Sequence, residues 1–71
     1  MHWNECDAVE HDTQKLSGAW LFVGTRVSVT ALFENLEAGA TIDEFVEWFP
    51  GVTRKQAQEV LQHAARSLDI V

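Results

Sequence analysis

Apolar side chains recur at helical spacing in three successive stretches of the chain, which predicts three helices that each bury one side. We expect Thr30 to be the N-cap of the first helix and Gly39 to end it. The second helix is expected after Thr41, and the third from Thr53 to about Leu68. The positions expected in the core are Val29, Leu32, Phe33, Leu36, Ile42, Phe45, Val46, Phe49, Ala57, Val60, Leu61, Ala64 and Leu68.

The junction between the second and third predicted helices has the clearest local signals. Thr41 and Glu44 have the spacing of a capping box. Thr53 and Gln56 have the same spacing. Pro50 cannot continue a helix, and Gly51 permits a turn that other residues resist. Two capped helices joined by a short turn are typical of a helix-turn-helix, which is the usual DNA-reading unit of small bacterial regulators.

Residues 16–29 predict two short strands ahead of the helices. Ala19–Val23 is rich in aromatic and branched residues, and Arg26–Val29 alternates between polar and apolar positions. Gly24 and Thr25 between them favour a hairpin turn. An isolated hairpin is only marginally stable in water, so it must either pack on the helices or pair with another chain along an edge. In so short a chain we expect a second copy to pair with the edge of Ala19–Val23.

Residues 1–15 have no clear periodicity and are expected to form an arm, which leaves residues 16–71 as the folded domain. Trp3 is the exception, because a large aromatic side chain usually packs on something. Trp3 either covers the domain's own core or contacts a second chain, since interfaces favour aromatic residues. Trp3, and Trp20 on the expected edge strand, are therefore candidate partner-binding residues.

The length of 71 residues leaves room for one domain with a small core. Cys6 is the only cysteine, so no internal disulfide is possible, and the three histidines lack metal-ligand spacing. Self-association is the expected extra source of stability, which predicts a homodimer. The sequence has no apolar run near the roughly 20 residues that span a bilayer and no basic start typical of a signal peptide, so we expect a cytoplasmic protein with no membrane partner.

The net charge of −6 argues against DNA as a partner, because phosphate contacts supply much of the affinity for DNA. The charges are distributed unevenly, however. Those within Thr41–Phe49 sum to −3, whereas those from Thr53 to Leu68 sum to +2. The locally basic third helix is therefore the one expected to enter a DNA groove, and the acidic residues elsewhere favour a basic partner protein.

The acidic residues of the second helix have local roles that need no catalysis. Asp43 and Glu44 stand where acids stabilise a helix N-terminus, and Glu44 also completes the capping box. We therefore expect no enzymatic activity, no metal site and no cofactor.

Several short motifs follow one another along the chain: Ser17-Gly18-Ala19, Gly24-Thr25-Arg26-Val27-Ser28-Val29, Leu36-Glu37-Ala38-Gly39-Ala40-Thr41, Asp43-Glu44-Phe45 and Phe49-Pro50-Gly51-Val52-Thr53. Together, in this order and spacing, they resemble the bacterial domain-of-unknown-function family 433 over about residues 16–68. One departure is Ser28, where the family commonly has proline. Serine keeps an amide donor that proline lacks, so the junction before the first helix is expected to be less rigid here.

The resemblance implies a mainly α fold, in which a short N-terminal β-hairpin is followed by a three-helix homeodomain-like helix-turn-helix. It also implies a function, because members of this family are widely regarded as VapB-like antitoxins. Such antitoxins are often encoded beside a PIN-like ribonuclease toxin.

With the third helix as recognition helix, the candidate DNA-binding residues are Arg54, Lys55, Gln58, Gln62 and Arg66. Arginine and lysine bind guanine edges or phosphates, and glutamine binds adenine through two hydrogen bonds. The alternative is an ordinary solvated helix face, rich in residues that favour helices.

Arg26 is the candidate contact to a toxin. PIN-type nucleases hold a divalent metal with several carboxylates, and an arginine can block such a site by pairing with them. The alternatives are that Arg26 reaches a phosphate, or that it pairs with an acid or a helix end within the chain.

These observations predict a non-enzymatic antitoxin that represses its own operon by binding the operator and holds a PIN-like toxin inactive. The alternative is a protein-interaction adaptor that has the helix-turn-helix shape without DNA binding. The net acidity of the chain favours that alternative.

Overall fold

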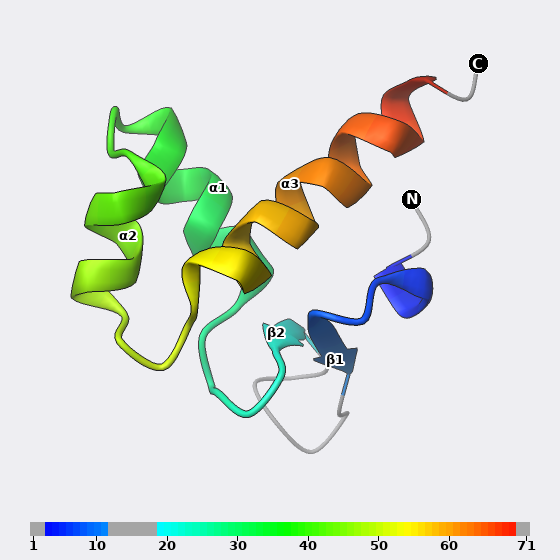
Figure 1. Cartoon of the computed structure of the whole chain (residues 1–71), viewed down its shortest axis with the longest axis horizontal. Helices are drawn as coiled ribbons and strands as arrows, with labels where there is room; N and C mark the ends of the chain where they lie inside the picture. Colours follow the sequence, from blue (N-terminus) through cyan, green and yellow to red (C-terminus); the bar gives the residue numbers. More distant parts are fainter. Residues whose placement is uncertain (1–2, 12–18, 70–71) are drawn as a thin grey trace.

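The computed structural model describes residues 3–11 and 19–69, and these residues form a short two-stranded sheet followed by helices (Figure 1). The predicted mainly helical fold with a preceding hairpin is confirmed. The elements are η1 (Trp3–Glu5), β1 (Val9–His11), β2 (Trp20–Phe22), α1 (Val29–Glu37), α2 (Ile42–Trp48) and α3 (Arg54–Asp69).

The hairpin differs from the expected one in its strands. β2 pairs in antiparallel fashion with β1, in the register Val9 with Phe22 and His11 with Trp20. The segment expected as the second strand, Arg26–Val29, forms only an isolated bridge between Leu21 and Ser28 among the described residues. The expected arm is therefore part of the fold from Trp3 to His11, while the rest of it lies outside the described residues.

Both edges of β2 are occupied. β1 covers one edge, where the Val23 amide donates to the Ala8 carbonyl at 3.0 Å. The other edge is covered by the chain after the turn, where the Phe22 amide donates to the Val27 carbonyl at 2.9 Å. The expected free edge at Ala19–Val23 is therefore wrong, because the chain itself takes both pairing positions of its central strand.

The turn after β2 is closed by the Thr25 amide, which donates to the Phe22 carbonyl at 3.0 Å. Gly24 has a φ of 79° in this turn, a conformation that favours glycine. The Thr25 hydroxyl donates to the same Phe22 carbonyl and accepts from the Val27 amide. The expected structural role of Gly24 and Thr25 is confirmed, although the turn is centred one residue earlier.

Ser28, and not Thr30, is the N-cap of α1. Its hydroxyl accepts a hydrogen bond from the Ala31 amide at 3.1 Å, a bond that a proline at this position could not provide. Gly39 ends the helix as expected, with a φ of 103°. The Gly39 and Ala40 amides donate to the Leu36 and Asn35 carbonyls, which is the Schellman arrangement.

Both predicted capping boxes are present at the starts of α2 and α3. Thr41 and Glu44 exchange side-chain and backbone hydrogen bonds of 2.9 and 3.1 Å, and Thr53–Gln56 makes the equivalent pair at 3.0 Å. Gly51, in the turn between them, has no positive φ. Space is limited there instead, because a β-carbon would lie 3.3 Å from the Thr25 methyl group, a tight contact.

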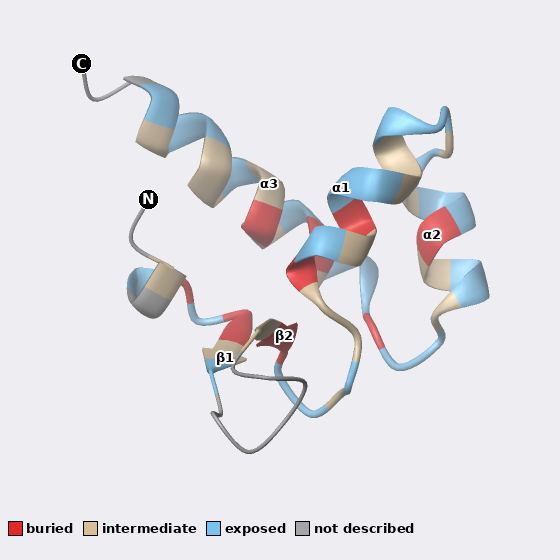
Figure 2. Cartoon of the chain, turned by 180° about the vertical axis from the view of Figure 1, so that it is seen from behind, coloured by how far each residue is buried: buried red, intermediate tan, exposed pale blue. Residues whose placement is uncertain are grey.

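The core lies between the hairpin and the helices (Figure 2). Phe22 of β2 and Phe45 of α2 are fully buried, and their ring centroids are 6.2 Å apart. The sequence prediction missed the N-terminal share of this core, which comprises Cys6, Ala8 and Val9. Most expected helix positions are buried or partly buried, but Phe33 is 36% exposed and Leu68 is 72% exposed. Those two assignments are wrong because the described residues cover that side of α1 only in part and leave most of the Leu68 side chain exposed at the end of α3.

Candidate nucleic-acid interface

The candidate DNA-binding residues all lie on α3, where Ala57 and Val60 anchor one side of the helix in the core. Helical geometry, with about 3.6 residues per turn, places Lys55, Gln62 and Arg66 on the opposite side, with Arg54 and Gln58 toward the border of the buried side. All of them are exposed, as a recognition helix requires: Arg54, Lys55, Gln58, Gln62 and Arg66. The structure thus exposes the whole predicted set along a single helix.

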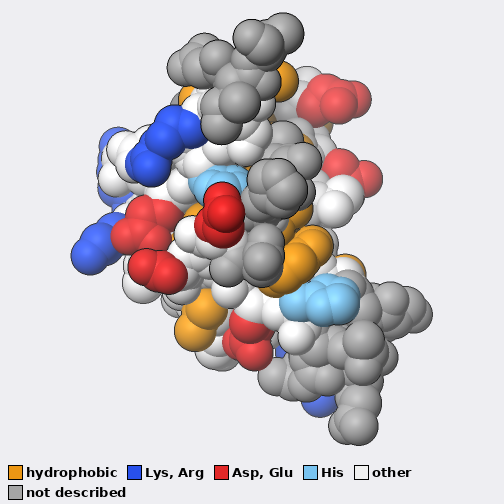
Figure 3. All heavy atoms as spheres, turned by 90° about the vertical axis from the view of Figure 1, so that its right-hand side faces the viewer, with side chains coloured by type: hydrophobic (Ala, Val, Ile, Leu, Met, Phe, Trp, Pro, Cys, Tyr) orange, Lys and Arg blue, Asp and Glu red, His pale blue; other side chains and the backbone are white. Residues whose placement is uncertain are grey.

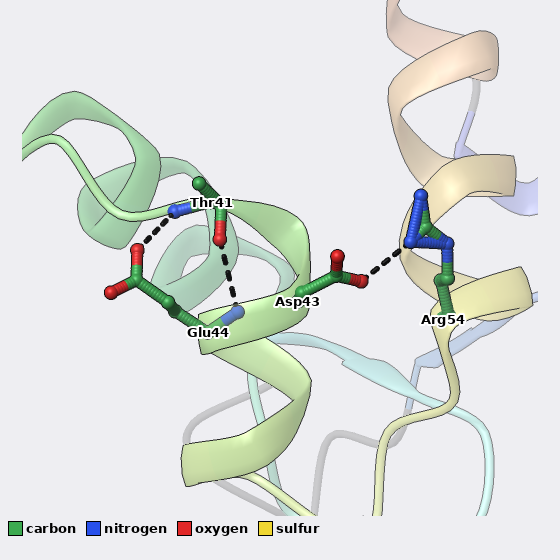
Figure 4. Close-up of polar contacts among 4 residues, drawn as sticks. All are labelled: Thr41, Asp43, Glu44 and Arg54. Atoms are coloured by element: carbon green, nitrogen blue, oxygen red, sulfur yellow. Dashed lines mark hydrogen bonds and ion pairs between the residues drawn. The ribbon is translucent and has the colours of Figure 1, made fainter.

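Arg54 is engaged within the chain. Its guanidinium contacts the Asp43 carboxylate of α2 at 2.5 Å, and both side chains are more than half exposed (Figure 4). Asp43 stands in the first turn of α2, next to the capping box of Thr41 and Glu44. An ion pair this exposed contributes little free energy, so a phosphate could replace the carboxylate as the partner of Arg54.

Arg66 at the other end of α3 has acidic neighbours. It lines a surface hollow of about 310 Å³ with Gln62, and Glu5, Asp7 and Glu59 line the same hollow. On the face seen in Figure 3, basic and acidic side chains lie beside one another and form no continuous basic area. The first half of α3, with Lys55 and Gln58, is therefore the more favourable part for an approaching phosphate backbone.

Gln56 and Arg26 have different environments. The Gln56 side chain is occupied by the capping box, and its amide nitrogen also donates to the Val23 carbonyl at 3.2 Å. This bond ties the start of α3 to the turn after β2. Arg26 is exposed and forms no ion pair or hydrogen bond with the described residues, so the expected internal partner is not found there.

Trp3 and Trp20 are partly buried and pack against the core of the same chain. The Trp3 ring lies 4.9 Å from the His63 ring and 6.5 Å from the Phe33 ring, while Trp20 lies 4.7 Å from His11. The first of the two interpretations of Trp3, that it covers the domain's own core, is confirmed. The Nε2 atom of His63 is buried without a hydrogen-bond partner among the described residues.

Two further properties hold within residues 3–11 and 19–69. The structure places no group of three or more His, Cys, Asp or Glu side chains where they could hold a metal ion. It also contains no helix that is both long enough and apolar enough to cross a membrane.

The sequence prediction missed the residues that surround the basic side chains. Asp43 lies eleven positions before Arg54, and Glu5 and Asp7 lie in a segment expected to be an arm. Their approach to α3 depends on tertiary packing, which has no periodic signal in the sequence. The acidic first turn of α2 was visible but was interpreted only as helix capping.

The described residues form a small, mainly helical domain. Its last described helix, α3, presents its polar side to solvent. The chain belongs to the family described as "Protein of unknown function (DUF433)", which matches residues 9–64. The matched region begins at β1, seven residues before the expected start at residue 16, so β1 belongs to the family's shared unit. No curated protein and no solved structure is significantly similar to the chain.

Proposed function

We propose that this protein is a non-enzymatic, cytoplasmic DNA-binding regulator that uses α3 as its recognition helix. The observation that supports this most directly is the exposed face of α3, where basic and amide side chains lie opposite a buried apolar side. Arginine, lysine and glutamine are the side chains best suited to contact phosphates and base edges. The short turn between two capped helices presents such a face in helix-turn-helix proteins.

Within that proposal, the residues of α3 divide into two roles. Arg54 and Lys55 stand at the N-terminus of the helix, where amide groups and the helix dipole also favour phosphate. Gln58 and Gln62 follow at intervals of one turn and are placed to contact bases. Arg66 is given a smaller role, because the acids that share its hollow repel a phosphate backbone.

We further propose the finer function that the family resemblance implies, an antitoxin that represses its own operon and neutralises a PIN-like ribonuclease. Arg26 supports this part, since it is exposed and no described acid pairs with it. A free guanidinium can form two hydrogen bonds to a carboxylate in a nuclease site. A neighbouring reading frame that encodes a PIN-like nuclease would support the antitoxin proposal directly.

The direct test is a gel-shift series with the DNA upstream of this protein's own gene, at several salt concentrations. Changing Arg54 and Lys55 together to Ala should weaken binding and reduce the slope of affinity against salt by about two phosphate contacts. Changing Gln58 and Gln62 to Ala should instead alter which sequences bind, with little change in the salt slope.

Arg26→Ala is the matched control, because it removes an exposed positive charge outside α3. It should leave the gel shift unchanged and weaken inhibition of the toxin. If the wild-type protein gives no shift at low salt, with or without a co-expressed neighbouring protein, the DNA-binding proposal is wrong.

A second candidate function is a protein-interaction adaptor without DNA binding. It is favoured by the net charge of −6, by the Arg54–Asp43 ion pair and by the acids around Arg66. An adaptor would show no affinity for DNA at any salt concentration and would still bind a basic partner protein through its acidic surface.

A further inference from the structure

Trp48 is the exposed tryptophan of this chain. Trp3 and Trp20 are partly buried against the core, whereas Trp48, the last residue of α2, is 55% exposed. Protein interfaces are enriched in aromatic side chains, so an exposed tryptophan is a candidate contact for another molecule. The proposed contacts of α3 and Arg26 do not involve this residue.

Trp48 lines a small hollow between α2 and the C-terminal end of α1. The hollow measures about 260 Å³ and is lined by Asn35, Ala38, Gly39, Ala40, Glu44 and Trp48. Pockets for whole small molecules typically measure about 300–1,000 Å³, so a hollow this small suits a single side chain. Glu44 and Trp48 are four positions apart on α2 and therefore lie on the same side of that helix.

The hollow lies in the most acidic part of the chain. Residues 29–49 contain five acids and no basic residue, so −5 of the net charge of −6 falls on α1, α2 and the turn between them. Asp43 is compensated by Arg54, but the four glutamates of this stretch are exposed and form no ion pair with any described residue. Two of them, Glu34 and Glu37, stand in the last turn of α1, where the helix dipole is also negative and favours a cation.

The Glu44 carboxylate is directed away from the cation of α3. Figure 4 shows the Asp43 side chain pointing toward Arg54 and the Glu44 side chain pointing back toward Thr41. The Oε1 atom of Glu44 accepts a hydrogen bond from the Thr41 amide at 2.9 Å. A carboxylate has about four acceptor positions, so its capping role leaves Glu44 able to bind a cation.

We propose that this hollow binds an arginine side chain from a basic segment of a partner protein, with the guanidinium stacked on the Trp48 ring and hydrogen-bonded to the Glu44 carboxylate. A guanidinium is planar and permanently charged, so it can stack on an aromatic ring and donate to a carboxylate at once. The surrounding charge identifies the partner as basic, because an acidic segment would be repelled. The site shares no residue with the proposed DNA-contacting set on α3, so it does not depend on DNA binding. For the adaptor alternative, it locates the contact to a basic partner.

The test is an NMR titration of the full chain with a short peptide of alternating arginine and glycine. It is done at about 0.15 M salt, where the Debye length is about 8 Å and distant charges are screened. The Gly39 backbone amide and the Trp48 indole N–H report on the hollow, because both residues line it. Both signals should shift with the arginine peptide. They should stay in place with a peptide in which citrulline, an uncharged group of similar shape, replaces each arginine.

Two variants each remove one half of the site and preserve the fold. Trp48→Leu keeps an apolar side chain but loses the aromatic face, so the dissociation constant should rise about tenfold. Glu44→Gln loses the charge but keeps the capping box, which accepts either residue, and the dissociation constant should rise about fivefold. Glu5→Gln is the matched control, because it removes the same charge from an exposed residue of η1, on the opposite side of the molecule from α2 in Figure 1. It should leave the dissociation constant within about twofold of the wild type. Circular dichroism should show the wild-type helix content for all three variants.

The proposal is wrong if the arginine peptide leaves the Gly39 and Trp48 signals unchanged, or if the citrulline peptide shifts them equally. It is also wrong if Glu5→Gln weakens binding as much as Glu44→Gln, because the attraction would then come from net charge alone. If the signals move with protein concentration in the absence of peptide, the homodimer expected from the sequence covers this face instead. DNA binding by α3 is tested separately by the gel shift, so either proposal can fail without the other.

Discussion

The helical part from Val29 to Asp69 and the N-terminal part from Trp3 to Ser28 share one core but are specified differently. The helix starts in the first part are fixed by residues three positions apart, as in the capping boxes of Thr41 and Thr53. In the second part β1 and β2 pair residues that are far apart in sequence, such as Val9 and Phe22. Local signals therefore locate the helices, while a long-range pairing decides which surfaces the domain leaves exposed.

This difference determines which apolar surface the described residues leave exposed. The sequence suggested a free strand edge at Ala19–Val23, yet β1 and the Val27–Ser28 segment occupy both sides of β2. The exposed apolar surface lies instead between α1 and the end of α3, where Phe33 and Leu68 remain uncovered. The local patterns predicted the helices correctly. They could not show which apolar positions on those helices would be covered by another part of the chain.

Phe45→Ala should have the largest effect and would show whether the two parts depend on one core. Phe45 is fully buried and contacts the rings of Phe22 and Phe49. Its truncation should cost about 3–5 kcal/mol, which approaches the whole stability of so small a domain. Leu61→Ala should cost less, about 1–2 kcal/mol, because Leu61 is only partly buried. Urea unfolding followed by circular dichroism measures both, and equal effects would contradict this assignment of the core.

Val9→Ala tests whether the N-terminal part stabilises the helices. Val9 is 8% exposed and belongs to the central cluster, so removing its two methyl groups should cost about 2 kcal/mol. Val23→Ala is the matched control, because Val23 is 44% exposed and should cost less than about 0.5 kcal/mol. If Val9→Ala melted like the wild type, residues 3–11 would be an arm after all.

The sequence was sufficient to predict the helices, their capping boxes and the face of α3, because each depends on short spacings. It did not predict the pairing of β1, since three residues of the pattern Val9-Glu10-His11 are too few for a periodic signal. It also did not predict the Arg54–Asp43 contact or the acids beside Arg66, which arise only when α2 and η1 pack against α3. The family was recognisable from motif order, but its shared unit starts earlier than the motifs.

Ser28→Ala and Thr30→Ala should separate the observed cap of α1 from the expected one. The Ser28 hydroxyl accepts a hydrogen bond from the Ala31 amide. Losing that hydroxyl should lower the free energy of unfolding by about 1 kcal/mol and the melting temperature by roughly 4–8 °C. Thr30 is exposed inside the helix and alanine favours helices, so Thr30→Ala should leave the melting temperature unchanged or raise it slightly. A larger loss from Thr30→Ala than from Ser28→Ala would restore the sequence-based boundary.

Asp43→Asn should have the smallest effect on stability and a larger effect on binding. Because Asp43 and Arg54 are both largely exposed, their ion pair contributes roughly 0–1 kcal/mol, and the free energy of unfolding should change by no more than that. The change also frees Arg54 and removes a negative charge beside it, so affinity for DNA should rise severalfold at low salt.

Glu37→Gln, which removes an exposed charge from α1, is the control for net charge alone. If both variants bound DNA equally well, Arg54 would have no specific part in the interface, because the gain would come from overall charge. If neither gained affinity, the acidity of α2 would not be what limits DNA binding.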